Sequence, residues 1–404
     1  MERLISAFGI FVILGLAWLM SSNRRLVPWR LIGAGLTLQF LLAVITLRTT
    51  PGFYVFDRIG AFFTNLLSFV GEGSKFVFGD LAEQHYFAFS ILPTIIFFSS
   101  LTSVLYYLGI MQRVVAAMAW VMVRTLRTSA AETLATSGNV FLGQTEAPLM
   151  IRPYVPLMTN SELNAVMVGG FATIAGGVMA AFVAMGIDAG HLVTASVISA
   201  PGALMIAKIL VPETEEPMTL DHLEVTVPQP ASNLLEAAAN GASEGLSLAL
   251  NIAAMLIAFL ALLAMCDAAI GWVGSLIGRT WSLQIGLSYL FYPLAWVMGV
   301  PSQDCLEAGR LLGVKMVLTE FQAYAELGNL MEGPSETRLN PRTETIMTYA
   351  LCGFSNFGSI GIQIGGLGQL APERRGDLSR LGFRAMLGGT LACCLTAAIA
   401  GMLV

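Results

Sequence analysis

Apolar residues fill long stretches of this chain, and mostly short polar turns separate them. A helix needs roughly 20 predominantly apolar residues to cross a bilayer. Candidate spans lie at 4–21, 29–47, 90–111, 163–187, 191–211, 245–266, 345–371 and 381–403. The pattern therefore predicts an all-α integral membrane protein with eight transmembrane helices.

Two more apolar segments do not read as ordinary spans. Residues 53–70 mix many Phe and Leu with Asp57 and Arg58, which is typical of an amphipathic helix lying in the membrane interface. The run 281–300 contains Pro293. It fits either a span or an interfacial, half-inserted helix.

Segments 129–158 and 303–330 carry polar residues in an apolar background. The first contains Gly143-Gln144-Thr145-Glu146-Ala147-Pro148 and the second contains Thr319-Glu320. A carboxylate at membrane depth costs about 2.5 kcal/mol or more on insertion scales, so it marks a functional site by default. Each segment is long enough for two half-length helices meeting at a polar tip. We expect both to be re-entrant hairpins, whose tips need protein or a water-filled cavity to satisfy their backbone.

A Gly-rich span follows each hairpin, and polar residues interrupt it between glycines at 170–176 and 353–359. Such a pattern favours a helix that unwinds and restarts, which frees backbone groups for a ligand. With eight spans the two hairpins fall on opposite sides of the membrane, so the halves form an inverted repeat. Inverted repeats with broken helices are typical of secondary transporters. Close helix packing is the alternative explanation of a single Gly-rich helix, but not of two preceded by polar hairpins.

The charged residues support this class and give an orientation. Of 404 residues, 56% are hydrophobic and 12% charged, against about 25% charged in soluble domains. Arg clusters follow the first and third candidate spans and precede the last, which places those turns in the cytoplasm and both termini in the periplasm. The chain has no basic patch that would bind nucleic acid.

Three other functions compete with this interpretation of the sequence. A channel would line a continuous pore with polar rings, which two offset hairpin tips argue against. A membrane-embedded enzyme would need a catalytic set, yet the five cysteines and three histidines do not cluster and no His-Glu-x-x-His motif occurs. A transporter of another polar metabolite on the same scaffold stays open.

The polar motifs are similar to those of the concentrative nucleoside transporter family, in a bacterial form. The resemblance rests on the hexapeptide 143–148, on Cys352-Gly353-Phe354-Ser355-Asn356 and on Gly365-Gly366-Leu367-Gly368, and it covers nearly the whole chain. It implies nucleoside import by cation symport in the bacterial inner membrane, with uridine-like substrates. It also implies a homotrimer whose scaffold holds three transport domains that move like elevators.

The resemblance divides the chain into four parts. Residues 1–128 would form scaffold spans 1–3 with the interfacial helix, and 129–212 the first half of the transport domain with hairpin 1 and spans 4 and 5. Residues 213–280 would hold an acidic loop and scaffold span 6. Residues 281–404 would form the second half of the transport domain, with an interfacial helix, hairpin 2 and spans 7 and 8.

Carried over by position, the resemblance assigns a nucleobase site, a ribose site and a lining residue. The base would contact Gln144, Thr145, Glu146 and Val178; the ribose would contact Glu320, Asn356 and Ser359; Phe354 would line the cavity. The chemistry agrees, because carboxylates accept strongly from hydroxyls and an amide offers both donors and acceptors. Alternatively the acids serve as proton relays or helix caps, the amides as interhelical bonds, and the two apolar residues as packing.

The resemblance also places a sodium ion between hairpin 1 and the broken fourth span. Its ligands would be the Asn139 side chain, the Leu142 carbonyl, the Thr173 hydroxyl and the Ile174 carbonyl. Neutral oxygens suit a weakly bound monovalent ion, whereas divalent ions favour carboxylate-rich cages. Related transporters use protons, so proton coupling is the alternative. No other cofactor is expected.

Overall fold

The computed structural model describes residues 1–83, 87–219, 231–276, 281–333 and 338–404. Every element in these ranges is helical, which confirms the all-α prediction. The first half contains α1 (Glu2–Leu19), α2 (Trp29–Arg48), α3 (Thr50–Phe78), α4 (Leu92–Tyr107), α5 (Ile110–Leu126), α6 (Ala130–Gly138), α7 (Asn160–Phe171) and α8 (Gly176–Ala184). The second half contains α9 (Ala189–Leu210), α10 (Leu234–Leu276), α11 (Leu283–Val297), α12 (Cys305–Val317), α13 (Glu320–Glu332), α14 (Pro341–Leu351), α15 (Phe357–Leu370) and α16 (Arg375–Leu403). Short 3-10 turns and one π turn complete it: η1 (Gly79–Glu83), η2 (Phe87–Ile91), η3 (Ala147–Ile151), η4 (Val155–Leu157) and η5 (Pro372–Arg374).

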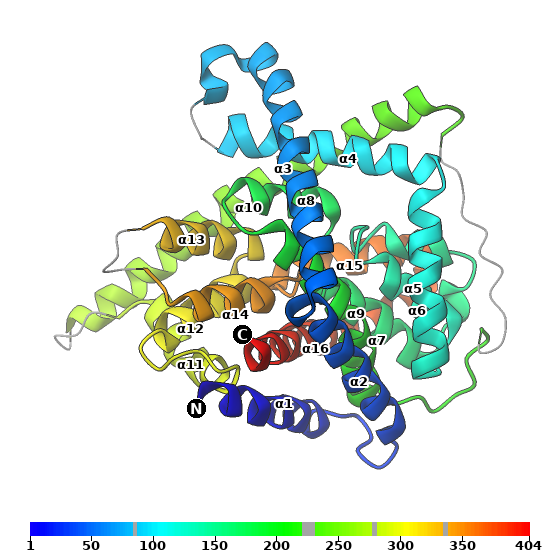
Figure 1. The fold of residues 1–404 in the computed structure, drawn as a ribbon. Helices are drawn as coiled ribbons and strands as arrows, with labels where there is room; N and C mark the ends of the chain where they lie inside the picture. Colours follow the sequence, from blue (N-terminus) through cyan, green and yellow to red (C-terminus); the bar gives the residue numbers. More distant parts are fainter. Residues whose placement is uncertain (84–86, 220–230, 277–280, 334–337) are drawn as a thin grey trace.

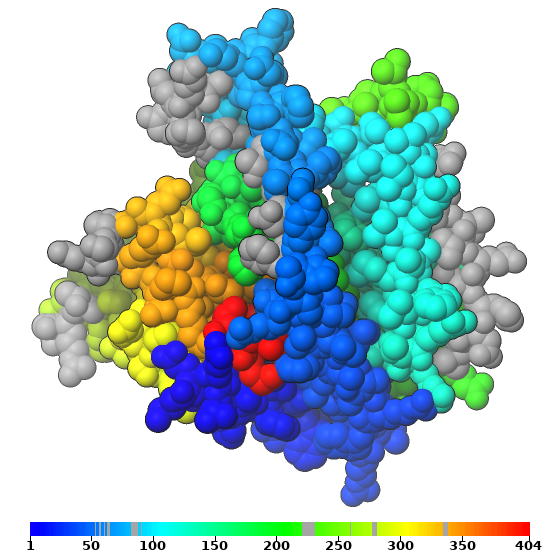
Figure 2. All heavy atoms as spheres, in the orientation of Figure 1, coloured from blue at the N-terminus to red at the C-terminus, as the bar shows by residue number. Residues whose placement is uncertain are grey.

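The last helix, α16, lies at the centre of the bundle (Figure 1). It packs against α1, α7, α9 and α14, and 89% of the residues in its most apolar stretch are buried. In Figure 2 only a small red patch of the C-terminal region reaches this face, between the blue N-terminal helices and the orange region. The core is therefore built from segments far apart in sequence.

Six helical stretches of the described chain are long and apolar enough to cross a membrane. They correspond to predicted spans 1, 2, 4, 5, 6 and 8, and they comprise 2–19, 29–48, 160–184, 189–210, 234–276 and 372–403. The predicted third span is α4, which bends by 76° into α5 and passes the same test only together with it. Gly109, at φ +75° in the left-handed region, makes that turn.

Several boundaries differ from the prediction, and the span predicted at 245–266 extends over 234–276 as α10. The helix predicted at 53–70 runs on to Phe78 as α3, because Glu72, Ser74 and Lys75 end the apolar pattern without breaking the helix. The run 281–300 forms the short helix α11, which packs against α12. The acidic stretch predicted at 213–236 falls partly on 220–230, outside the described residues.

Both predicted hairpins are present, with different second arms. Hairpin 2 consists of α12 and α13, which pack together and meet at Leu318-Thr319. Hairpin 1 begins with α6, but its return arm is two 3-10 turns, η3 and η4, instead of a helix. Pro148, Pro153 and Pro156 explain this, because proline cannot continue the hydrogen-bonding pattern of an α-helix.

Both predicted breaks are also present. α7 ends at Phe171 and α8 begins at Gly176, while α14 ends at Leu351 and α15 begins at Phe357. The structure therefore shows each half of the chain as a hairpin followed by an interrupted helix.

Candidate functional site

The tip of hairpin 1 is a tight turn that fixes Glu146. The Gly143 N–H donates to the Glu146 carboxylate at 3.1 Å, and the Glu146 N–H donates back to the Gly143 carbonyl at 3.0 Å. The Glu146 side chain is exposed on the surface of the single chain. It folds back onto the tip and lines the cavity beside it, where it can accept further hydrogen bonds.

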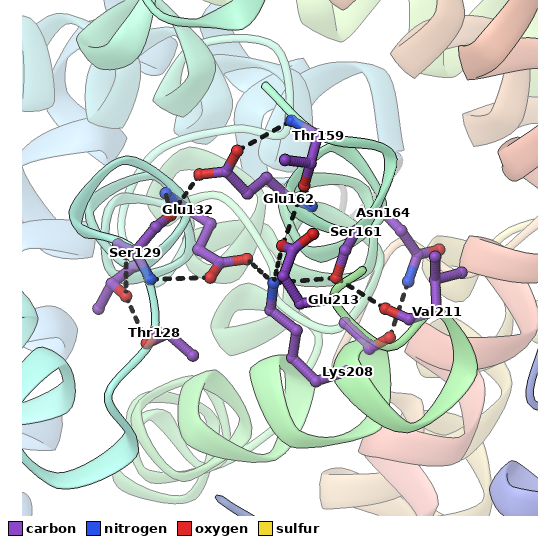
Figure 3. A network of polar contacts seen from close by, with 12 residues as sticks. Thr128, Ser129, Glu132, Thr159, Ser161, Glu162, Asn164, Lys208, Val211 and Glu213 are labelled. Atoms are coloured by element: carbon purple, nitrogen blue, oxygen red, sulfur yellow. Dashed lines mark hydrogen bonds and ion pairs between the residues drawn. The ribbon is translucent and has the colours of Figure 1, made fainter. Parts of the chain in front are cut away.

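A network of buried polar residues anchors the other end of hairpin 1 (Figure 3). Ser129 with Glu132 caps α6, and Thr159 with Glu162 caps α7, each as a capping box. Between them lies the Lys208 ammonium of α9, which contacts Glu132 at 2.8 Å, Ser161 at 2.9 Å and Glu213 at 3.1 Å. The base of the hairpin is thereby fixed to α7 and α9.

Gln144 joins the hairpin 1 tip to α15. Its side-chain oxygen accepts from the Gln363 amide at 3.0 Å, and Gln363 also donates to the Met167 carbonyl at 3.0 Å. Gly170 makes room for this contact, because a Cβ there would lie 2.7 Å from the Gln363 amide nitrogen. Thr145 packs in the same way against Gly366.

Glu320 and Asn356 form the corresponding contact in the second half. The Asn356 amide donates to the Glu320 carboxylate at 2.8 Å, and its oxygen accepts from the Ser359 N–H at 2.8 Å, which caps α15. Glu320 is 5% exposed. A carboxylate so deeply buried needs hydrogen-bond donors, and a ligand with hydroxyl groups would supply more of them.

All eight residues predicted to bind the substrate line a single cavity of about 130 Å³. The cavity lies between the hairpin tips, the restart of each broken helix and one face of α10. It is smaller than a typical ligand pocket of about 300–1,000 Å³, and two of its polar side chains, Asn356 and Glu320, already hydrogen-bond each other, while the Gln144 side chain is bonded to Gln363 behind the wall. A ligand must therefore replace or extend these contacts.

Several residues at the site were missed from the sequence. Gln363 lies one and two turns beyond Ser359 and Asn356 on one face of α15, and this spacing was a usable signal. On α10, the residues that close the cavity are Leu248, Ile252 and Met255. Their spacing and apolar character are those of any membrane helix face, so nothing in the sequence distinguishes them as cavity-lining residues.

The residues predicted to bind sodium lie where hairpin 1 meets the first break. The Phe141 carbonyl accepts from the Gly176 N–H at 2.9 Å, which ties the hairpin tip to the start of α8. Asn139 is fully buried, and neither atom of its amide has a hydrogen-bond partner in the described part of the chain. The Thr173 hydroxyl is also buried and donates to the Gly169 carbonyl at 2.9 Å, which leaves its oxygen free to accept. Such unsatisfied neutral oxygens fit a small monovalent cation.

The two breaks touch each other. The Phe354 N–H donates to the Thr173 carbonyl at 3.3 Å. A Cβ on Gly353 would lie 2.6 Å from the Phe171 carbonyl oxygen and 2.7 Å from the Cys393 sulfur. Only glycine allows this approach, so the interrupted helices are packed directly against one another at the residues where they unwind.

Three protein-family models together match nearly the whole chain. A family model described as Na+ dependent nucleoside transporter C-terminus matches residues 191–401, one described as Na+ dependent nucleoside transporter N-terminus matches 8–81, and one described as nucleoside recognition matches 88–189.

Two curated relatives match all of this chain. Mouse solute carrier family 28 member 3 is 45% identical over 414 residues, and rat sodium/nucleoside cotransporter 1 is 46% identical over the same length. The chain spans 59% and 64% of the length of these two relatives. A solved structure described as CNTnw in an inward-facing substrate-bound state superimposes with a TM-score of 0.95 at 39% identity, covering 100% of this chain and 98% of that one.

Proposed function

Because the chain belongs to the Na+ dependent nucleoside transporter family, we propose that it imports nucleosides together with sodium ions. One observation carries the proposal: residues from two hairpins and two helix breaks, distant in sequence, line one cavity. No single span holds the site. A ligand bound there is held by both halves of the repeat, as alternating access requires.

The polar groups divide between the two parts of a nucleoside. Gln144, Thr145 and Glu146 at the first tip hydrogen-bond the base, with Val178 packed beside it. A base edge presents donors and acceptors that an amide, a hydroxyl and a carboxylate match. At the opposite side, the ribose hydroxyls donate to Glu320 and bond Asn356 and Ser359, and Phe354 closes the wall. Uridine-like nucleosides are the substrates.

Sodium binds the Asn139 side chain, the Leu142 and Ile174 carbonyls and the Thr173 hydroxyl. The buried Asn139 amide, which has no hydrogen-bond partner among the described residues, supports this assignment, because an unsatisfied polar group in the interior is otherwise costly. An ion there would hold the tip of hairpin 1 against the break. Since that tip also carries Gln144 and Glu146, ion binding and nucleoside binding reinforce each other.

The chain divides into a moving transport domain and a fixed scaffold. Residues 129–212 and 281–404 form the transport domain, and 1–128 with 213–280 form the scaffold. Three copies assemble as a homotrimer, and each transport domain moves as an elevator against its scaffold. The protein is a multi-pass membrane protein; its location is the bacterial inner membrane with both termini in the periplasm.

Uptake of labelled uridine into proteoliposomes tests the proposal. Inward sodium gradients should drive accumulation above equilibrium, and replacing sodium with choline at constant pH should abolish it. Accumulation that persists in choline and follows a pH gradient would assign the coupling to protons. Failure to bind or accumulate any nucleoside, with another polar metabolite taken up, would overturn the substrate assignment.

A further inference from the structure

A second and larger cavity lies beside the substrate cavity. Its volume is about 330 Å³, within the range of small-molecule sites. It lies between the hairpin 1 tip, the start of α8, and the helices α4 and α10. The two cavities share Glu146, Ala175 and Leu248, so they adjoin at the carboxylate assigned to the base.

The wall on the α4 side carries a stripe of hydroxyl groups. Ser99, Thr102, Ser103 and Tyr106 follow one another at helical spacing, and all four line the cavity. α10 adds the amide of Asn240 and the carboxylate of Glu244. Polar side chains on helices of an integral membrane protein are expensive and face functional cavities by default.

The packing of α4 on α10 places these groups. A Cβ on Gly241 would lie 2.8 Å from the Ser100 Cα, and one on Gly245 would lie 2.8 Å from the Ile96 Cα. The glycines let the two helices touch along one line. Their neighbours Asn240 and Glu244 are then left beside the contact, on the wall of the cavity.

One face of α10 passes from polar to apolar along its length. Asn240 and Glu244 line the larger cavity, Leu248 lines both cavities, and Ile252 and Met255 line the substrate cavity. A nucleoside in the substrate cavity thus meets apolar side chains on the scaffold. If the transport domain moves along α10, its cavity comes opposite the polar end.

We propose that the larger cavity is a second, weaker nucleoside site on the path of entry or release. There Glu244 and Asn240 of the scaffold hydrogen-bond the nucleoside while it leaves or approaches Glu146. A carboxylate accepts from the N–H and O–H groups of a nucleoside, and an amide offers both a donor and an acceptor. The inference rests on the proposed function, because it takes nucleosides as the substrate.

Saturation-transfer NMR of uridine with the purified full chain tests this site. The wild type should bind uridine tightly. In a background that disables the substrate cavity, Glu320→Gln with Asn356→Ala, a weaker saturable signal should remain. Adding Glu244→Gln and Asn240→Ala should weaken that signal at least fivefold. Glu236→Gln makes the same charge change elsewhere on α10, outside the cavity, and should leave it unchanged.

Two outcomes overturn the second site: no saturable signal in the disabled background, or a signal that Glu244→Gln and Asn240→Ala do not change. A wild type that binds no nucleoside at all would instead refute the proposed function. If the variants fail to fold, photo-crosslinking of 4-thiouridine to the wild type decides the matter. Adducts on α4 or α10 near Tyr106 or Glu244 support the site, and adducts confined to the hairpins and α15 overturn it.

Discussion

The N–H of Phe354 donates to the carbonyl of Thr173 and so joins the two helix breaks directly. Phe354 lines the substrate cavity, and Thr173 belongs to the proposed sodium site. One backbone hydrogen bond therefore links the proposed nucleoside site to the proposed sodium site directly. No long relay is needed for ion binding to affect the substrate, because a shift of either break displaces the other.

The close approach at Gly353 should be sensitive to one added methyl group. Gly353→Ala would push a Cβ against the Phe171 carbonyl and the Cys393 sulfur, and overpacking of this kind typically costs about 1–3 kcal/mol. We expect a lower melting temperature together with a loss of uridine uptake. In Gly361→Ala on α15 the added Cβ meets no atom within 4 Å outside its own helix in the described part of the chain, so this variant is the matched control. Equal behaviour of the two variants would contradict the role of the close contact.

Glu320 should act through the ribose hydroxyls. Removing the hydroxyl from the substrate or the charge from the carboxylate leaves a buried partner unpaired, which costs about 1–3 kcal/mol, or roughly fivefold to 150-fold in affinity. We expect 3′-deoxyuridine to bind the wild type that much more weakly than uridine. In Glu320→Gln this preference should shrink towards unity. Titration calorimetry of both ligands measures it, with Glu332→Gln at the far end of α13 as the control.

A preference for uridine that is unchanged in Glu320→Gln would remove Glu320 from the ribose site, whatever the loss of overall affinity.

Asn139 should control the dependence on sodium. Asn139→Ala removes a side-chain ligand, so we expect the sodium concentration for half-maximal uptake to rise several-fold. Asn164 is an equally buried amide of α7, but its side chain donates to the Ala207 carbonyl at 3.0 Å. Asn164→Ala should lower the melting temperature without moving the sodium dependence. Uridine uptake at varied sodium measures this dependence. If Asn164→Ala shifts the half-maximal sodium concentration and Asn139→Ala does not, Asn139 is excluded as a ligand.

The Lys208 network should dominate the stability of hairpin 1. Lys208→Met leaves the buried Glu132 carboxylate without its cation, and breaking a buried pair costs about 3–5 kcal/mol. We expect a large fall in melting temperature, partly restored in Lys208→Met with Glu132→Gln. Arg380, whose side chain is 79% exposed, pairs with Asp377 at the surface, so Arg380→Gln should have little effect. A melting temperature of Lys208→Met equal to that of Arg380→Gln would show that the network is not the anchor.

The sequence indicated both hairpins and both breaks because polar residues and glycines interrupt otherwise apolar segments there. Such interruptions are costly in a membrane and so are visible locally. The 76° bend between α4 and α5 was missed, since a single Gly109 in an apolar run looks like any membrane glycine. The pairing of Gln363 with Gln144 was missed for another reason. It joins residues far apart in the chain, and only the packed fold brings them together.

The length of α10 has a mechanical consequence. Its 43 residues correspond to about 65 Å at 1.5 Å per residue, roughly twice the ~30 Å hydrocarbon thickness of a bilayer. A helix of that length must lie steeply inclined or project well beyond the membrane. If α10 is strongly tilted from the membrane normal, a transport domain that slides along it also changes its depth in the bilayer. The bound nucleoside would then be carried across the membrane by that sliding movement.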